Sequence, residues 1–342
     1  MVSEAQRLMT ICNSCRYCEG YCDVFPAMER RLKFTEADIH YLANLCHNCA
    51  ECYYACQYAP PHEFAVNVPK AFAQVRAESY RKFAWPRYLS VSAWWAVAAG
   101  LIVIRLLAGG RLASPANFYG VIPHASMVAV FGIAVAVILA IHVTGFLGFW
   151  RETGEGGATP SAIAQAVRDV LSLKNLSSHG AGCTYPKERH SQTRRVFHHF
   201  TFYGFALCFA STTVAALYHF AGHIAPHPYL SAPVILGTLG GIGLLIGPAG
   251  LYWLKRRRDP AIADSKQDSS DVSFIVLLFL TSLTGLLLLA LRETAAMSVL
   301  LRVHLGIVLG LFLTLPYGKF VHGVYRSAAL IRSALETARS QH

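Results

Sequence analysis

The sequence predicts an all-α membrane protein in which a small cysteine-rich helical domain precedes a bundle of six transmembrane helices. Of the 342 residues, 54% are hydrophobic and only 14% are charged, which is too apolar for an ordinary soluble protein. Eight of the ten cysteines lie within residues 12–56, whereas the long apolar runs begin after Trp85. We therefore expect a cytoplasmic domain at residues 1–84 and a transmembrane domain at residues 85–342.

Six apolar runs are each about 20 residues or longer, enough to cross a hydrocarbon core of roughly 30 Å as a helix. They lie near residues 88–108, 121–149, 196–220, 230–254, 272–291 and 298–318. Lys and Arg concentrate in the links 151–195 and 255–271, whereas the intervening turns hold one Arg at most. The positive-inside rule therefore predicts a multi-pass protein of the cytoplasmic (inner) membrane with both termini cytoplasmic. This placement accounts for the net charge of +11 without a nucleic-acid partner.

The N-terminal segment MVSEAQR has no apolar stretch behind its charges, so we expect no cleaved signal peptide. The cysteine-rich domain would then stay in the cytoplasm, where thiols are kept reduced. This compartment argues against disulfides and favours a metal site.

Two cysteine runs, CNSCRYCEGYC at residues 12–22 and CHNCAECYYAC at residues 46–56, share the spacing C-x2-C-x2-C-x3-C. This spacing is typical of bacterial ferredoxins with two [4Fe–4S] clusters, in which the fourth cysteine of each run ligates the other cluster. The expected ligands are Cys12, Cys15, Cys18 and Cys56 for one cluster, and Cys46, Cys49, Cys52 and Cys22 for the other. Zinc is the alternative, although zinc sites usually draw pairs of cysteines from separate knuckles.

The segment RRLKFTEADIHYLANL between the two cysteine runs has helical spacing, so we expect an α-helical ferredoxin-like domain. Cys183 and Cys208 fit neither run, and we expect them to be packing residues.

Histidines in the apolar runs form a second pattern. His304 and His322 are 18 residues apart in the last run, so a continuous helix would place them on one face about 27 Å apart. Ionisable groups inside a membrane tend to mark function, and facing imidazoles at two depths suit two bis-histidine haems. No C-x2-C-H motif occurs, so such haems would be b-type. The other candidate ligands are His198, His199, His219 and His142, with a purely structural role as the alternative for each.

Glycines recur in the fourth apolar run, among them Gly237, Gly240, Gly241, Gly243 and Gly247. Small residues of this kind favour close packing between transmembrane helices. Room for a haem or a quinone is the alternative interpretation.

The segments CNSCRYCEGYCDVFPAM and LCHNCAECYYACQYAPPHEF resemble the cluster domain of the tricarballylate (citrate) utilisation protein B family. The resemblance continues through RRVFHHFTFYGFALCFASTTVAALYHFAGH and HLGIVLGLFLTLPYGKFVHGVYR, and covers nearly the whole chain. The membrane part is also similar, more weakly, to the haem-b γ subunit of nitrate reductase, whose last helix carries two haem histidines. That resemblance assigns haem ligation to His304 and His322, and it points to the pair His198 and His199 and to His219 for the other axial positions. The nitrate reductase pattern spaces its partner histidines more closely, so His142 and His124 stay open as candidates.

The family resemblance implies an electron-transfer protein. A soluble FAD-dependent dehydrogenase would oxidise tricarballylate to cis-aconitate, and its flavin would be reoxidised through the two clusters and one or two haems b into the quinone pool. The residues alone favour the same class, because cytoplasmic clusters joined to a membrane bundle with histidine pairs connect a soluble donor to a lipid-soluble acceptor. The chain has no G-x-G-x-x-G fingerprint for FAD or NAD, so a flavoprotein partner is expected.

Other function classes fit the sequence less well. A transporter would need a substrate site near the middle of the membrane, but the apolar runs contain few acidic or helix-breaking residues there. A redox sensor would need an output domain, and no recognisable one follows the bundle. A ferredoxin-like membrane anchor without haem remains an alternative.

Overall fold

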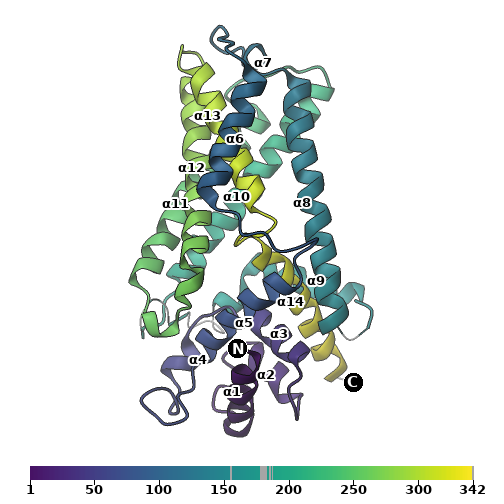
Figure 1. The fold of residues 1–342 in the computed structure, drawn as a ribbon, viewed down its shortest axis with the longest axis vertical. Helices are drawn as coiled ribbons and strands as arrows, with labels where there is room; N and C mark the ends of the chain where they lie inside the picture. Colours follow the sequence, from purple (N-terminus) through teal and green to yellow (C-terminus); the bar gives the residue numbers. More distant parts are fainter. Residues whose placement is uncertain (155, 178–182, 185, 187, 341–342) are drawn as a thin grey trace.

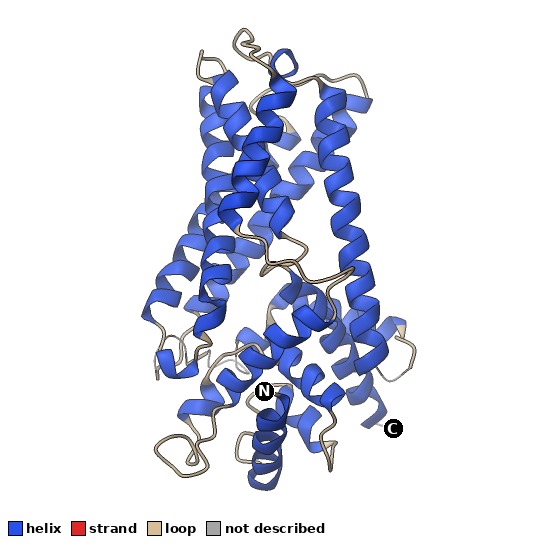
Figure 2. Ribbon diagram, in the orientation of Figure 1, coloured by secondary structure: helices blue, strands red, loops and turns tan. Residues whose placement is uncertain are grey.

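The computed structural model describes residues 1–154, 156–177, 183–184, 186 and 188–340. Within these ranges the chain is helical and contains no strand; an isolated bridge joins Cys183 to Ser191. Figure 2 shows that helices build both the long bundle and the group of short helices below it. The prediction of an all-α fold is confirmed. Both termini lie at the end of the molecule formed by the short helices (Figure 1).

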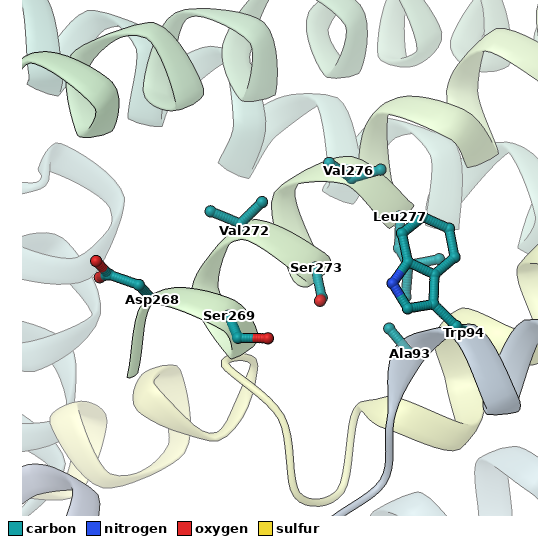
Figure 3. Close-up of a pocket in the computed structure, with 8 residues that line it drawn as sticks. All are labelled: Ala93, Trp94, Asp268, Ser269, Val272, Ser273, Val276 and Leu277. Atoms are coloured by element: carbon teal, nitrogen blue, oxygen red, sulfur yellow. The ribbon is translucent and has the colours of Figure 1, made fainter. Parts of the chain in front are cut away.

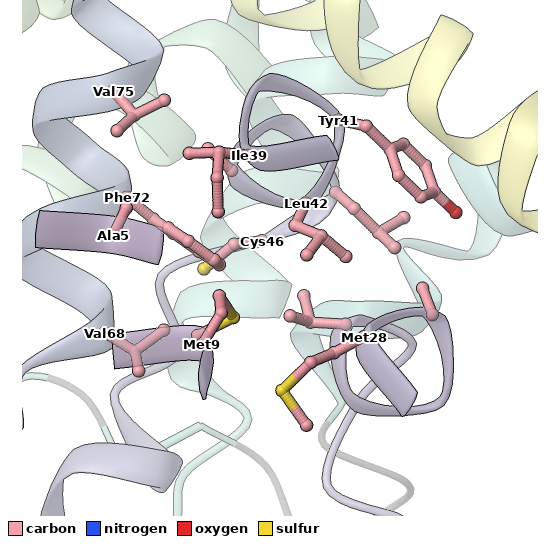
Figure 4. Close-up of a cluster of buried hydrophobic side chains, with 14 of the residues drawn as sticks. Ala5, Met9, Met28, Ile39, Tyr41, Leu42, Cys46, Val68, Phe72 and Val75 are labelled. Carbon is pink, nitrogen blue, oxygen red and sulfur yellow. The ribbon is translucent and has the colours of Figure 1, made fainter. Parts of the chain in front are cut away.

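Five helices form the N-terminal part of the fold: α1 (Val2–Cys15), α2 (Val24–Glu29), α3 (Glu36–Leu45), α4 (Glu51–Tyr54) and α5 (Val68–Lys82). Helix α3 begins at a capping box, in which Thr35 and Asp38 satisfy each other's backbone N–H groups. The side chains of Met9, Ile39 and Phe72 are completely buried between α1, α3 and α5, as Figure 4 shows. Burial of these apolar side chains stabilises the helices that carry the cysteine runs.

The bundle consists of α6 (Ala93–Ala108), α8 (His124–Thr153), α10 (Thr193–Phe220), α11 (Ala232–Arg257), α12 (Asp268–Leu291) and α13 (Met297–Thr314). Five of the six, all except α6, are long and apolar enough to cross a membrane, so the chain is a multi-pass membrane protein. Helix α6 is apolar but has only 16 residues, or about 24 Å of rise. It begins later than the predicted start at residue 88.

Shorter elements join the long helices. These are α7 (Phe118–Val121), α9 (Pro160–Ser172), η1 (Lys174–Leu176), η3 (Pro260–Ile262) and η4 (Ser265–Gln267). Helix α9 buries Ala162 and Ala166, whereas Ile163, Val167 and Leu171 remain exposed on its outer face.

Glycines bring α10 and α11 into backbone contact. A Cβ atom added at Gly240 would lie 2.7 Å from the Cys208 nitrogen, and one added at Gly204 would lie 2.9 Å from the Gly240 oxygen. Only residues without a side chain allow this approach. Close packing therefore accounts for Gly240, and Cys208 packs against it as predicted.

The last transmembrane helix ends earlier than the sequence suggested. Helix α13 stops at Thr314, and α14 (Val321–Ser340) begins after a turn that contains Pro316 and Gly318. Proline lacks the N–H group for the helical hydrogen bond, and its ring clashes with the carbonyl group four residues earlier. The expectation that His304 and His322 share one face of one continuous helix is therefore wrong.

Helix α14 leaves the bundle and packs on the N-terminal helices, where Ala329 and Leu330 join their core. Glu336 of α14 forms a buried ion pair with Arg31, and accepts a hydrogen bond from the Tyr41 hydroxyl group at 3.1 Å. The C-terminal helix thus links the cysteine-rich part of the chain to the membrane bundle.

Candidate electron-transfer site

The first predicted cysteine set lines one cavity of about 210 Å³ that includes Cys12, Cys15, Cys18 and Cys56. Cys12 and Cys15 lie in the last turn of α1, which ends because Arg16 adopts the left-handed conformation with φ of 54°. This turn reverses the chain so that Cys18 faces the same cavity, and Cys56 reaches it from the end of α4.

The second predicted set lines a narrower cavity that includes Cys22, Cys46, Cys49 and Cys52. Cys46 caps α3, and Asn48 and Ala50 both have positive φ angles that fold the loop back on itself. The Asn48 N–H group donates a hydrogen bond to the Cys46 sulfur at 3.3 Å. Cys52 lines both cavities, so the two sites are adjacent.

The spacing of the sulfur atoms distinguishes a cluster from zinc. Four thiolates bound to one zinc ion lie about 3.8 Å apart, as follows from a Zn–S distance of about 2.3 Å. In the described part of the chain, no three cysteine sulfur atoms lie within 4.8 Å of one another. A cubane cluster has one iron at each of four corners and holds its thiolates farther apart. The arrangement of the cysteines therefore fits [4Fe–4S] clusters better than zinc.

Burial and, to a smaller extent, the neighbouring Cys18, Cys56 and Cys15 together raise the pKa of the Cys12 thiol to about 12. Thiols that raise one another's pKa in this way gain stability from a bound cation, because metal binding removes their protons.

A group of carboxylate and imidazole atoms also lies within metal-binding distance of one another, at Glu36, His40 and Glu152. Lys82 forms ion pairs at 2.7 Å with both of these carboxylates. We interpret the group as an ion-pair cluster that joins α3, α5 and α8, since the Lys82 ammonium group takes the place of a metal cation.

Two predicted haem ligands face each other. The imidazole rings of His198, on α10, and His322, on α14, have centroids 6.3 Å apart and an interplanar angle of 64°. Two imidazoles that bind the same metal ion from opposite sides, each at about 2.0 Å, have ring centroids roughly 6 Å apart. The His322 Nδ1–H group donates to the Lys319 oxygen at 2.5 Å, which leaves Nε2 available as a ligand. Burial and the nearby Arg326 hold the pKa of His322 well below its usual range, so the ring is neutral, as a ligand must be.

These two histidines line a further cavity of about 210 Å³ between the bundle and the N-terminal helices. His47, which directly follows Cys46, lines the same cavity, as do Arg76, Arg194 and Arg326. The sequence analysis missed these four residues. For two of the arginines the sequence did contain a signal. Arg194 lies four residues before His198 in RRVFHH, and Arg326 lies four residues after His322 in HGVYR, a spacing that places each pair on one helical face.

The other candidate histidines are not paired in this way. The His219 ring stacks on His124 with centroids 3.6 Å apart, too close for an iron between them. His304 lies beside Thr284, with its Nδ1 atom 3.0 Å from the hydroxyl oxygen. In the described residues no ring contact joins His304 to another histidine.

His142 and His199 lie near the pair but face other groups. His142 Nε2 donates to the Leu315 oxygen at 3.3 Å, and the His199 ring packs against Tyr203 with centroids 5.7 Å apart. Neither residue lines the cavity between His198 and His322.

Cys183 is completely buried beside Cys49, a member of the second cysteine set. Its Sγ atom donates a hydrogen bond to the Leu176 oxygen at 3.3 Å. Cys183 thus packs directly against the second cysteine set.

A cavity of about 310 Å³ lies apart from all of these groups, between the start of α6 and α12 (Figure 3). Trp94 and Leu277 form one end, and Asp268 lies at the other. Asp268 is paired with Lys255 and Arg258. No candidate cysteine or histidine lines this cavity.

Comparison with known proteins places the chain in a family. The family described as citrate utilization protein B matches residues 88–342, and the citrate utilization protein B Fer4-like domain matches residues 5–82. The chain is 51% identical over 354 aligned positions to citrate utilization protein B from Escherichia coli, with 99% of this chain and 93% of that protein covered. No solved structure matches the chain. The chain therefore belongs to the citrate utilization protein B family.

Proposed function

We propose that the protein transfers electrons from the reduced FAD of a soluble dehydrogenase to membrane quinone, as part of tricarballylate or citrate utilisation. The Fer4-like domain, the membrane helices and the family membership support the general role of an iron–sulfur membrane protein in this process. Two [4Fe–4S] clusters on the eight cysteines and haem b at His198 and His322 supply one-electron carriers when bound. Tricarballylate dehydrogenase is the partner that the family resemblance implies.

The observation that carries this proposal is the cavity between the cysteine loop and the histidine pair. His47 stands next to Cys46 in the chain and lines this cavity together with His198 and His322. The His47 Nδ1–H group donates to the Leu45 oxygen at 2.8 Å, which fixes the orientation of the ring. The loop that carries the second cysteine set thus lies directly against the proposed haem site.

The exposure of the cysteines favours a direction of transfer. Cys46 and Cys49 of the second set are buried, whereas every cysteine of the first set is partly exposed. Tyr17, within the first cysteine run, is 64% exposed. A soluble dehydrogenase would therefore dock beside the first set, on the cytoplasmic side of the inner membrane, and the second set would face the bundle.

The purified, detergent-solubilised full-length protein tests this function. We expect about eight iron and eight sulfide ions per chain and a b-type reduced-minus-oxidised absorption spectrum. The pyridine haemochrome assay measures the number of haems per chain, for which we expect one or two. Iron and sulfide without haem would overturn the haem assignment and leave a ferredoxin-like anchor. A protein with both cofactors that a reduced flavoprotein dehydrogenase cannot reduce would favour the redox-sensor alternative.

A further inference from the structure

We propose that Arg76, Arg194 and Arg326 form a carboxylate-binding site that holds the propionate groups of the haem. This inference rests on the proposed function, because it specifies how the cavity at His198 and His322 recognises that haem. The three arginines come from three different helices, α5, α10 and α14, and all line this cavity.

The arginines surround the loop that carries the second cysteine set. Arg76 Nη1 donates to the Ala43 oxygen at 2.8 Å and to the Cys46 oxygen at 3.2 Å. Arg326 Nη2 donates to the same Cys46 oxygen at 2.8 Å. Arg194 Nη1 donates to the Asn48 oxygen at 2.8 Å. Backbone carbonyl groups thus fix the guanidinium groups of Arg76 and Arg326 without neutralising their charge.

Other cations of the cavity have carboxylate partners. Lys255 pairs with Asp268 and Asp271, and Lys319 pairs with Asp271 at 2.8 Å. Among the described residues, neither Arg76 nor Arg326 has a carboxylate partner.

The cluster of cations is electrostatically unfavourable as it stands. Arg76 is 7% exposed, and it donates to the same Cys46 oxygen as Arg326, so two like charges meet at one buried carbonyl group. Buried like charges are tolerated when an anion compensates them. An anionic ligand in this cavity would supply the missing negative charge, and guanidinium groups match the geometry of carboxylates.

The position of the arginines relative to the histidines indicates which carboxylate-bearing ligand would fill the cavity. Arg194 precedes His198 by four residues on α10, and Arg326 follows His322 by four residues on α14. Residues at this spacing are neighbours on one helical face. A ligand held by the two imidazoles therefore has a cationic donor within one helical turn of each, and the acidic groups of haem b are its two propionates.

Haem dimethyl ester, in which both propionates are esterified, tests the inference on the cluster-containing, haem-free full-length protein. We expect the wild-type chain to bind haem about tenfold or more tightly than the ester, because charge-assisted hydrogen bonds are lost with the ester. Arg326→Gln and Arg76→Gln should each reduce this preference, whereas Arg326→Lys should retain part of it.

Arg292→Gln is the matched control. Arg292 is also buried and donates to a backbone carbonyl, the His227 oxygen at 2.7 Å, but it does not line the cavity. This variant should keep the full preference for haem. Unchanged iron and sulfide contents would show that each variant is folded.

Equal affinity of the wild-type chain for haem and its ester would overturn the inference while leaving the proposed function intact. Citrate is a second probe of the same site. If the wild-type chain binds haem and its ester equally, and the arginine variants bind citrate more weakly than the wild-type chain, the site takes a soluble tricarboxylate and not the propionates. If the wild-type chain binds neither form of haem, both the inference and the haem assignment fail.

Discussion

His198 and His322 face each other across one cavity, with ring centroids 6.3 Å apart, although they belong to different helices. The turn after Thr314 makes this contact possible, because α14 changes direction there and carries His322 toward α10. The Lys319 oxygen within this turn accepts the His322 Nδ1–H bond and fixes the ring. The helix break thus creates the histidine pair.

Replacement of either member of the pair should remove the haem that we propose for this site. We expect His198→Ala and His322→Ala each to lose most of the b-type absorption that this site contributes, because bis-histidine ligation fails without one axial ligand. His199→Ala is the matched control, since this neighbour packs against Tyr203 and does not line the cavity. Loss of haem in His199→Ala but not in His198→Ala would show that His199, and not His198, is the axial ligand.

Replacement of the fourth cysteine of each run should affect the cluster bound by the other run. Cys56 lines the cavity of Cys12 and Cys15, so Cys56→Ser should disturb that cluster and lower the iron content from about eight toward about four per chain. Cys22→Ser should do the same to the other cluster. Electron paramagnetic resonance of the reduced protein would separate the two signals. Cys208→Ser should keep both clusters, and loss of iron in this control would contradict the assignment.

The sequence predicted the parts of the site that depend on local spacing. Two cysteine runs of the same spacing predict two ligand sets. One cavity contains the first set and the other contains the second set, although Cys52 of the second set lines both. Long apolar runs located the transmembrane helices to within a few residues, except at the start of α6.

The features that the sequence analysis missed depend on tertiary contacts. Helical periodicity paired His304 with His322 because it assumed one continuous helix, whereas Pro316 ends α13 between them. The contact of His322 with His198 joins segments far apart in the chain, and no periodicity reports such a contact. The role of Arg76 was hidden for the same reason, since its partner is the backbone of a distant loop.

A methyl group on Gly240 should destabilise the bundle. Its Cβ atom would lie 2.7 Å from the backbone nitrogen of Cys208, so α10 and α11 would have to separate. We expect Gly240→Ala to cost about 1–3 kcal/mol, as for other overpacked sites, and to lower the midpoint of thermal unfolding in detergent. Gly132→Ala is the control, because nothing lies within 4 Å of a Cβ atom at that position of α8. Equal stability of the two variants would show that the α10–α11 contact is looser than described.

Loss of the Glu336 charge should weaken the attachment of the N-terminal helices to the bundle. Glu336 is 7% exposed and pairs with Arg31 and with Arg332, and these two buried guanidinium groups also share Asp38. Glu336→Gln therefore removes one of their two shared carboxylates. Breaking a buried pair from one side costs about 3–5 kcal/mol, whereas the exposed pair of Glu4 and Arg7 should contribute at most about 1 kcal/mol.

Limited proteolysis between the N-terminal helices and the bundle measures this attachment. Cleavage near residues 83–92, the segment between α5 and α6, should be faster in Glu336→Gln than in the wild-type chain, and unchanged in the Glu4→Gln control. Because α14 carries both Glu336 and His322, the same variant should also slow electron transfer from the clusters to the haem. Cleavage and transfer rates equal to those of the wild-type chain would show that the apolar contacts of Ala329 and Leu330 hold α14 in place without the ion pair.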